Sequence, residues 1–299
     1  MRAYLQELLV YTGESLVFEE AGELIEKLLH IPVNGKQAER LCHHYGQLLE
    51  EQSPEKKLQK DSRLHYAMVD EGMVLTREQS WKELKVGRVF PAAAVLAENE
   101  GRDFISSSSY TAYLGSREMF FDKLCGTTDA LANLVWIADG ARWIWNWVGD
   151  HYPQAVQILD YYHCKEKLCL FAQHAFKEET ERKQWIEEQE ELPFADQVEI
   201  VIANVAFMHL KAEAKKQQQS LLTYYGHNKE RMRYGTYRQK GYLIGSGAVE
   251  AAIRQLVQQR LKLSGQRWTM QGAQQMANLR VAKKSGEWKR VRDLIVNQV

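Results

Sequence analysis

The sequence has few cysteines and no long hydrophobic run, and each shortage argues against a class of protein. Four cysteines occur in 299 residues, and no two of them form a CxxC pair. This usage argues against a disulfide framework and predicts reduced thiols in a cytoplasmic protein. No apolar run reaches the roughly 18 residues of a membrane helix, so no membrane span is expected. The first residues, MRAYLQELLVYTGE, contain acids and no long apolar core, so no signal peptide is expected.

Acidic residues are almost absent from one stretch near the C-terminus. Between Arg231 and Gly286 the chain has eleven Lys or Arg and a single acid, Glu250. The segment His227–Val299 holds 15 basic and 4 acidic residues, a net charge of +11, and the rest of the chain has a net charge of −11. The formal net charge of +0 therefore hides a basic C-terminal quarter. Such a quarter indicates a polyanionic partner or, as the alternative, a solvated basic surface.

The N-terminal part of the chain shows helical periodicity. Hydrophobic residues make up 45% of the sequence, enough for a globular core in one large domain or two smaller ones. Apolar residues recur at helical spacing in AYLQELLVY, FEEAGELIEKLLH and GKQAERLCHHYGQLLEEQ. Residues 1–53 are therefore expected to be helical, either as a helix-turn-helix or as helices of a plain bundle. The polar segment SPEKKLQKDSR (53–63) is expected to be a linker.

Residues 64–163 change to a mixed pattern. Strands are predicted for LHYAMVD (64–70), WKELKVGRVF (81–90), FISSSSYTAYL (104–114), LVWIADG (134–140) and AVQILDYYH (155–163). Helices are predicted for SREMFFDKLCG (116–126) and ARWIWNWVGDHY (141–152). This order indicates an α/β domain with a mixed sheet. Residues 164–232 are expected to be helical and charged, and residues 233–299 to form a loop followed by helices at about 247–263, 270–284 and 287–297.

Two acids end apolar runs in the predicted core. Asp70 closes one run and Asp139 closes another, and an acid at the end of an inner strand usually lies at the open edge of the sheet. Neighbouring carboxylates repel each other unless a cation lies between them, and oxygen ligands suit Mg²⁺ or Mn²⁺. Two such carboxylates and a third from a helix can hold two ions roughly 4 Å apart, the arrangement that nucleases and polymerases use for phosphoryl transfer.

Glu250 is the candidate for the third carboxylate. Gly245 and Gly247 permit a close approach of the backbone, and Ser246 is a suitable N-cap for the helix that follows. That helix has an apolar stripe that can pack on the sheet, formed by Val249, Ile253, Leu256 and Val257. The alternative is a surface pair between Glu250 and Arg254, worth about 0.3–0.5 kcal/mol.

Several motifs together resemble a known family. The segments VDEGMV, ADGARWIW, ILDYYH and GSGAVEAAIRQLVQQRLKLSGQRW resemble the DDE transposases of bacterial insertion sequences, of the ISKra type. The most specific part of the resemblance is RMRYGTYRQKGYLIGSGAVE, and the likeness extends from about residue 5 to residue 292. It implies a ribonuclease H-like mixed sheet flanked by helices, with a helical insertion between the second and third acids. It also implies that Asp70, Asp139 and Glu250 are the catalytic triad and the ligands of Mg²⁺ or Mn²⁺.

The resemblance divides the chain into four parts and supplies further candidates. The parts are a helical N-terminal region (1–53), the first part of the core (64–163), the insertion (164–232) and the C-terminal helices that complete the core (233–299). Asp160 and His163 resemble a C/D-x-x-H motif that orders the site or contacts DNA, while His163 could instead cap or pack. Trp268, in a GxRW motif, could stack on a base or belong to the core.

Two features depart from the resemblance. Glu71 follows the first acid where a small residue is expected, which puts a fourth carboxylate near the site. Relatives usually carry an upstream, often cysteine-rich segment, and this chain begins about where their middle begins. The sequence therefore also fits a truncated or decayed copy.

The function expected from these features is metal-dependent cleavage of DNA strands and strand transfer by a transposase in the cytoplasm, associated with the nucleoid. The partner would be DNA, at element ends and target, with a homo-oligomer assembled on it. The residues expected to contact DNA are Arg231, Arg233, Arg254, Arg260, Lys262, Arg267 and Trp268. Two alternatives are a retired transposase that only binds DNA and a metal-dependent nuclease without strand transfer.

Overall fold

The computed structural model describes residues 1–51, 60–97 and 103–298, and the chain forms two compact units. Unit 1 consists of Met1–Asn133 and Ala248–Val299, and unit 2 consists of Leu134–Gly247. Residues 53–59 of the predicted linker lie outside the described residues. Within the described ranges, no helix is both long and apolar enough for a membrane crossing.

A five-stranded mixed sheet has the strand order β5-β2-β1-β6-β7. Its strands are β1 (Asp61–Thr76), β2 (Ser80–Pro91), β5 (Ser109–Leu114), β6 (Leu131–Ala138) and β7 (Val156–Leu159). Strands β1, β2 and β5 pair antiparallel, and β6 and β7 pair parallel. Two short strands, β3 (Val95–Ala97) and β4 (Asp103–Ile105), pair separately. The prediction of a mixed α/β sheet is confirmed.

Three predicted strands have the wrong extent. The strand expected to end at Asp70 continues to Thr76, because the apolar pattern resumes at Val74 and the turn comes only after Thr76. The Thr76 hydroxyl donates to Ser80 O over 2.8 Å, and Ser80 takes the left-handed φ of 59° that closes this turn. The strand predicted for 155–163 stops at Leu159, because Asp160 caps a helix instead. The strand predicted for 104–114 is divided between β4 and β5.

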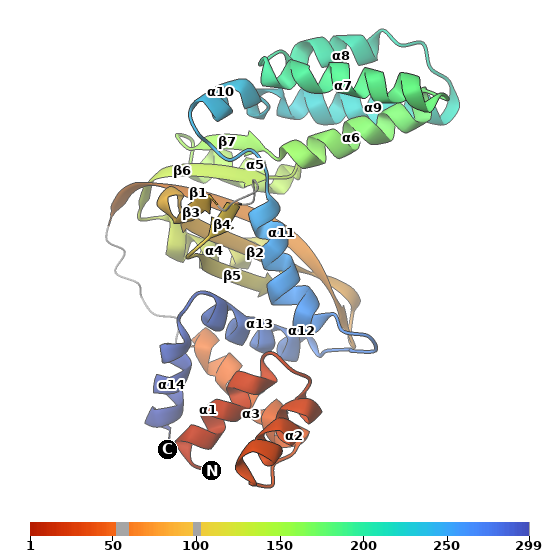
Figure 1. The fold of residues 1–299 in the computed structure, drawn as a ribbon. Helices are drawn as coiled ribbons and strands as arrows, with labels where there is room; N and C mark the ends of the chain where they lie inside the picture. The colour runs from red at the N-terminus through yellow and green to blue at the C-terminus, as the bar shows by residue number, and fades with distance from the viewer. Residues whose placement is uncertain (52–59, 98–102, 299) are drawn as a thin grey trace. The chain divides into compact units, whose positions relative to one another are not determined.

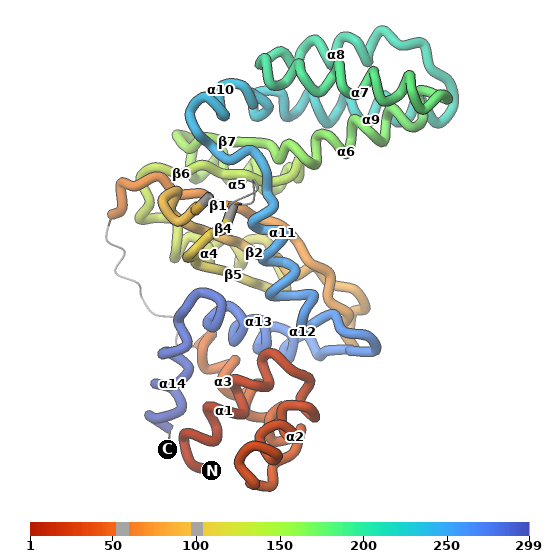
Figure 2. Tube along the Cα trace, viewed as in Figure 1, coloured from red at the N-terminus to blue at the C-terminus, as the bar shows by residue number. Residues whose placement is uncertain are grey.

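In unit 1, helices from the two ends of the chain pack against each other. Helices α1 (Ala3–Gly13), α2 (Phe18–Leu29) and α3 (Gly35–Glu51) match the predicted ones, and they pack with α13 (Met270–Lys284) and α14 (Trp288–Asn297). Figure 2 shows both termini on neighbouring helices of this group. At the α3–α13 contact, a Cβ on Gly46 would lie 2.3 Å from Gln275 O, so only glycine permits this approach. The N-terminal helices therefore pack as a bundle. On the sheet, α4 (Arg117–Thr128) places Leu124 against Gly87.

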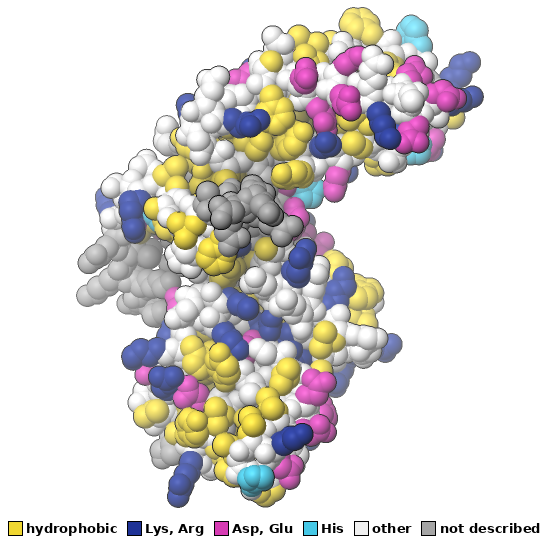
Figure 3. Space-filling view, viewed as in Figure 1, with side chains coloured by type: hydrophobic (Ala, Val, Ile, Leu, Met, Phe, Trp, Pro, Cys, Tyr) yellow, Lys and Arg dark blue, Asp and Glu magenta, His cyan; other side chains and the backbone are white. Residues whose placement is uncertain are grey.

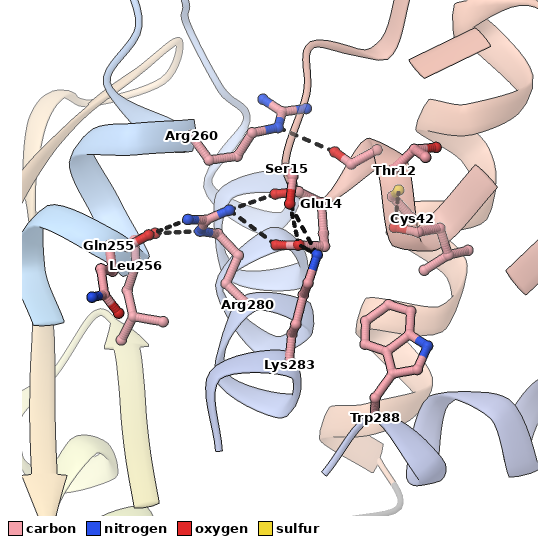
Figure 4. A network of polar contacts seen from close by, with 12 residues as sticks. Thr12, Glu14, Ser15, Cys42, Gln255, Leu256, Arg260, Arg280, Lys283 and Trp288 are labelled. Carbon is pink, nitrogen blue, oxygen red and sulfur yellow. Dashed lines mark hydrogen bonds and ion pairs between the residues drawn. The ribbon is translucent and has the colours of Figure 1, made fainter. Parts of the chain in front are cut away.

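A buried ionic network fastens this helix group together (Figure 4). Glu14 and Arg280 are 1% and 3% exposed, and Arg280 Nη1 lies 2.9 Å from Glu14 Oε2. Arg280 also donates through Nε to Leu256 O over 2.9 Å, and Lys283 forms a second ion pair with Glu14. Since an unpaired buried charge is costly, these contacts hold the end of α1 to α13 and to the helical segment around Leu256.

Unit 2 is mostly helical after its two strands. It contains α5 (Arg142–His151), α6 (Tyr161–Ala175), α7 (Glu179–Phe194), α8 (Val198–Ala206), α9 (Ala212–Asn228) and α10 (Tyr234–Gln239), shown in Figure 1. The helical character predicted for residues 164–232 is confirmed, whereas α10 occupies a segment that was expected to be a loop. On the visible face of α6–α9 in Figure 3, acidic side chains are interspersed with Lys and Arg, as on a solvated surface.

A helical stretch follows from Gly247, as predicted. It begins as α11 (Gly247–Ile253), continues as a π-helical segment (Arg254–Gln258) and ends as α12 (Gln259–Leu261). Its apolar stripe is buried, with Val249, Leu256 and Val257 all at 0% exposure. The predicted packing face of this helix is therefore confirmed.

Candidate functional site

Two acids follow neighbouring parallel strands of unit 2. Asp139 comes directly after β6 and Asp160 directly after β7, and the last residues of these strands, Ala138 and Leu159, are paired. The amide of Asp160 donates to Ala138 O over 2.8 Å. Because parallel strands end at the same edge of a sheet, Asp139 and Asp160 lie side by side there.

Asp139 is held by its own loop with one carboxylate oxygen still available. Its Oδ1 accepts a hydrogen bond from Ala141 N at 3.0 Å, and its carbonyl accepts one from Trp145 Nε1 at 2.6 Å. In the described part of the chain, Oδ2 accepts no hydrogen bond. The next residue must be glycine, because a Cβ on Gly140 would lie 2.1 Å from the ring of Tyr224. The half-buried Asp139 is thus placed rigidly and can still bind a ligand.

Tyr224 was not predicted as part of this site. It comes from α9, and no motif in that polar helix distinguishes it. Burial raises the pKa of its hydroxyl, and the negative charge of Asp139 raises it further. Tyr224 is therefore an uncharged side chain that packs beside Asp139.

Asp160 is fully buried and its carboxylate accepts several hydrogen bonds. Oδ1 accepts from Tyr162 N at 2.7 Å, which caps α6, and Oδ2 accepts from His163 Nδ1 at 2.9 Å. The Ser246 hydroxyl also donates to Oδ2. Burial alone would raise the pKa of Asp160, but the hydrogen bonds from His163 and Ser246 outweigh it and lower the pKa. Asp160 is therefore a carboxylate at neutral pH.

His163 carries a positive charge in this setting. Its hydrogen bond to Asp160 raises its pKa to about 9, against an opposing effect of burial, and the charges of Asp160 and Asp139 contribute further. The imidazolium lies 2.9 Å from the Asp160 carboxylate and its side chain is 35% exposed. The two residues form an ion pair at the strand edge that also bears Asp139.

The segment before α11 is fastened to the same edge. The amide of Tyr161 donates to Ile244 O over 3.0 Å, and Ser246 donates to Asp160. A close approach was predicted for Gly245 and Gly247: a Cβ on Gly245 would lie 2.7 Å from the Tyr162 ring, whereas a Cβ on Gly247 would meet no atom within 4 Å, so the prediction is wrong for Gly247. Ser246 was predicted as an N-cap, and its hydroxyl is used to bind Asp160. Glu250, exposed in the first turn of α11, follows four residues after this anchor.

In unit 1, Asp70 and Glu71 point to opposite faces of β1, since successive strand residues alternate. Glu71 Oε1 lies 3.8 Å from Nζ of Lys85, which is 3% exposed and sits opposite Glu71 in β2. Asp70 is half-buried, and its Oδ1 accepts from Glu71 N at 2.7 Å. The fourth carboxylate at Glu71 therefore pairs with a lysine on the face away from Asp70.

The face of β1 that contains Asp70 is covered by α11 and the π-helical segment. A Cβ on Gly72, two residues after Asp70, would touch Val257 at 3.1 Å and Ile253 at 3.3 Å. Further along, Thr76 forms a parallel bridge with Trp268, in the segment that follows the helix. Glu250 lies three residues before Ile253 in this helix, and its side chain is exposed.

The start of α11 is also anchored to the sheet within unit 1. Arg88 of β2, only 7% exposed, donates through Nη1 to Ala248 O over 2.7 Å and through Nε to the Ser108 hydroxyl over 2.9 Å. The first turn of α11, which carries Glu250, therefore has a fixed position on unit 1.

One comparison with known proteins assigns the sequence to a family. The sequence profile of the Uncharacterised protein family (UPF0236) matches residues 50–296, which is most of the chain. The chain belongs to this family. A search of curated proteins finds no match. The UPF0236 match includes all five of the acidic and histidine candidates, from Asp70 to Glu250.

The tyrosine-rich motif of this UPF0236 chain has a structural role. The Tyr234 hydroxyl donates to Leu159 O over 2.9 Å and the Tyr237 hydroxyl to Gln157 O over 3.1 Å, so both tyrosines hold α10 to β7. A Cβ on Gly235 would lie 2.3 Å from Phe194 O. The RYGTY sequence therefore braces the strand that ends at Asp160.

The residues predicted to contact DNA fall into different environments. Exposed side chains are those of Arg254, Lys262 and Arg267. Arg231 is half-buried and donates to Gln157 Oε1 over 2.8 Å, and Arg233 pairs with Glu199 at 3.1 Å. Of the basic residues predicted to contact DNA, Arg254, Lys262 and Arg267 are therefore the accessible ones in unit 1.

Arg260 and Trp268 are core residues, and for Arg260 the predicted DNA contact is wrong. Arg260 is 0% exposed and donates through Nε to Gly13 O over 3.1 Å, and burial lowers its pKa to about 10. Its guanidinium carbon lies 5.0 Å from the centre of the Trp268 ring. Trp268 is 7% exposed and donates to Leu261 O over 3.2 Å. Of the two alternatives predicted for it, a place in the core is therefore the one observed.

Proposed function

We propose that this UPF0236 chain is a DDE-type transposase that cleaves DNA strands and joins them to a target. The observation that carries the proposal is the packing of α11 on the face of β1 that contains Asp70. Glu250, the only acid between Arg231 and Gly286, lies in the first turn of this helix, and the resemblance selects Asp70 as its partner in the triad. The mixed sheet, with three antiparallel strands and the parallel pair β6–β7, supports the ribonuclease H-like core implied by the resemblance.

The donor groups fit a hard divalent cation. Asp70, Asp139 and Glu250 offer carboxylate oxygens, the ligands that Mg²⁺ and Mn²⁺ prefer. Asp139 keeps Oδ2 for such a role, and Glu250 is exposed. We propose that these three residues hold two ions. When bound, the ions supply activation of the attacking oxygen and stabilisation of the leaving oxygen.

Asp160 and His163 are proposed as positioning residues. Asp160 joins the start of α6 to Ser246, the residue before α11. The imidazolium of His163 supplies a positive charge beside Asp139, which suits a DNA phosphate.

Phosphate binding is assigned to exposed cations of the basic quarter. Arg254, Lys262 and Arg267 belong to the segment that contains Glu250 and to the loop after it, and all three are exposed. Contacts with phosphates position DNA without reading its sequence. Their loss should weaken binding uniformly across sequences and make it less dependent on salt.

A strand-joining assay separates this proposal from its two rivals. The purified chain is incubated with supercoiled plasmid and a labelled oligonucleotide that ends in a 3′-hydroxyl, with Mn²⁺ or Mg²⁺. The proposal predicts nicked plasmid and plasmid that carries the label, with both products abolished by EDTA. Nicking without label transfer would indicate a nuclease, and DNA retardation without nicking would indicate a protein that only binds DNA.

A further inference from the structure

Unit 2 contains a cavity of about 830 Å³ that begins at Gly140, the residue after Asp139. Its walls come from α5, α6 and α9 and from the short turn that contains Arg231. The lining includes the cations Arg142, Lys167, Lys216 and Arg231, and it includes no Asp or Glu. The volume falls in the range of roughly 300–1,000 Å³ that is typical of pockets for small-molecule ligands.

Three of these cations lack an acidic partner. Across the described residues, Arg142, Lys167 and Arg231 form no ion pair. Other cations of unit 2 do, including Lys165 with Glu190 at 2.7 Å and Lys183 with Glu179 at 2.6 Å. Lys216, at the rim, pairs with Glu213 at 3.0 Å. The positive charge of the cavity is therefore left for an external anion.

Aromatic rings hold these cations in place. The guanidinium of Arg231 lies 4.7 Å from the centre of the Trp145 ring, and Nζ of Lys167 lies 5.9 Å from that of Tyr224. Arg142 donates through Nη2 to a ring nitrogen of His227. Arg231 donates through Nε to Gln157 Oε1 and through Nη1 to His227 O and Asn228 Oδ1, so its Nη2 and the ammonium of Lys167 keep their donors for a ligand. The remaining lining is polar and neutral, with Asn146, Gln219 and Thr223 among it.

We propose that this cavity binds an unpaired segment of a DNA strand, one or two nucleotides long, with its phosphates on Arg142, Lys167 and Arg231. Cations interleaved with aromatic rings are the usual means of binding single strands. The volume of about 830 Å³ has room for one or two nucleotides and is too small to enclose a double helix. The choice of DNA rests on the proposed function, because the cavity adjoins Asp139 and would receive the strand next to the cleaved phosphate.

Binding measured without metal tests this proposal separately from catalysis. Fluorescence anisotropy is measured in EDTA with a labelled single-stranded oligonucleotide and with a blunt duplex of the same sequence. The wild-type chain should bind the single strand more tightly. Lys167→Ala should weaken single-strand binding by about tenfold and lower the slope of log K against log salt by about 0.7, the value for one phosphate contact. The matched control Lys183→Ala, which removes an exposed, ion-paired lysine of the same unit, should change neither.

Arg142→Gln provides a second variant that leaves Lys167 intact, and it should reproduce the loss. Equal affinity for duplex and single strand would overturn the proposal, as would unchanged binding by both variants. Displacement of the oligonucleotide by equimolar ATP would also overturn it, since it would indicate a site for free nucleotides. A chain that binds single strands through Lys167 and never cleaves DNA would support this inference and refute the proposed function. A chain that cleaves DNA, with both variants binding single strands as tightly as the wild type, would support the proposed function and refute this inference.

Discussion

Asp160 illustrates how one buried carboxylate organises its surroundings. It follows β7, caps α6, pairs with His163 and accepts a hydrogen bond from Ser246 ahead of α11. From the sequence, its place after an apolar run and its spacing to His163 were visible. Its bond to Ser246, 86 residues away, was not, because no local pattern encodes a contact of that separation.

The ion pair of Asp160 and His163 should make stability depend on pH. Because the folded pKa of His163 is raised from 6.5 to about 9, its stabilising contribution is complete below pH 6.5 and is lost as the pH rises through 9. The wild-type chain should therefore exceed His163→Gln in free energy of unfolding at pH 6, and the difference should shrink by pH 9.5. Urea denaturation in EDTA measures this. A difference that stays constant over this range would show that His163 stabilises by packing alone.

Two glycines near each other in sequence should respond in opposite ways to alanine. Gly140→Ala places a Cβ at 2.1 Å from the Tyr224 ring and should destabilise the chain by about 1–3 kcal/mol through overpacking. Gly149→Ala, on α5 with no atom within 4 Å of its Cβ, should stabilise by about 0.4–1 kcal/mol. Thermal unfolding of both variants measures these two changes in stability against the wild-type chain. If Gly140→Ala is as stable as Gly149→Ala, Tyr224 does not lie against Gly140.

At the scale of elements, periodicity predicted most helices and strands but not where each strand ends. The helices α1 to α3, the hairpin strand β2 and the buried strand β6 follow directly from their apolar spacing. Asp70 was taken as a strand end because an acid is rarely buried, yet it is half-exposed within β1. Polar residues inside a strand give no signal of whether the strand stops or continues.

The packing of α11 was predictable only in part. Its apolar stripe was visible in the sequence, and the stripe is buried as expected. Its π-helical segment and the contact of Ile253 and Val257 with Gly72 depend on tertiary fit. The glycine at position 72 was the one local sign that something approaches β1 closely.

The buried pair between α1 and α13 should contribute strongly to stability. Arg280→Met leaves Glu14 buried with one of its two cationic partners and should destabilise by about 3–5 kcal/mol. The matched change Lys289→Met removes an exposed partner of Asp293 on α14 and should cost less than about 1 kcal/mol. Chemical denaturation of both variants compares them. A cost for Arg280→Met as small as that for Lys289→Met would contradict the role assigned to the network in Figure 4.

At the scale of the whole molecule, the net charge of the C-terminal quarter overstated how much of its basic surface is exposed. The basic quarter includes Arg260 and Arg280, which are 0% and 3% exposed and hold helices together. It also includes Arg233, which pairs with acids of its own unit. A count of charges cannot separate such residues from solvated ones, because burial depends on contacts between distant segments. Of the three cavity cations of unit 2 that form no ion pair, Arg142 and Lys167 lie outside the basic quarter (227–299) and only Arg231 lies within it.

The most direct test of the DDE assignment is the activity of Glu250→Gln. The change keeps the shape of the side chain and removes the charge that would bind a metal ion. We predict that Mn²⁺-dependent nicking of DNA falls by at least about a hundredfold, since the ions supply both nucleophile and leaving-group stabilisation. DNA binding should persist, and stability without metal should be equal or higher because repulsion between carboxylates is relieved. The control Glu187→Gln, at an exposed position of α7, should nick DNA like the wild-type chain. Wild-type nicking by Glu250→Gln would contradict the assignment.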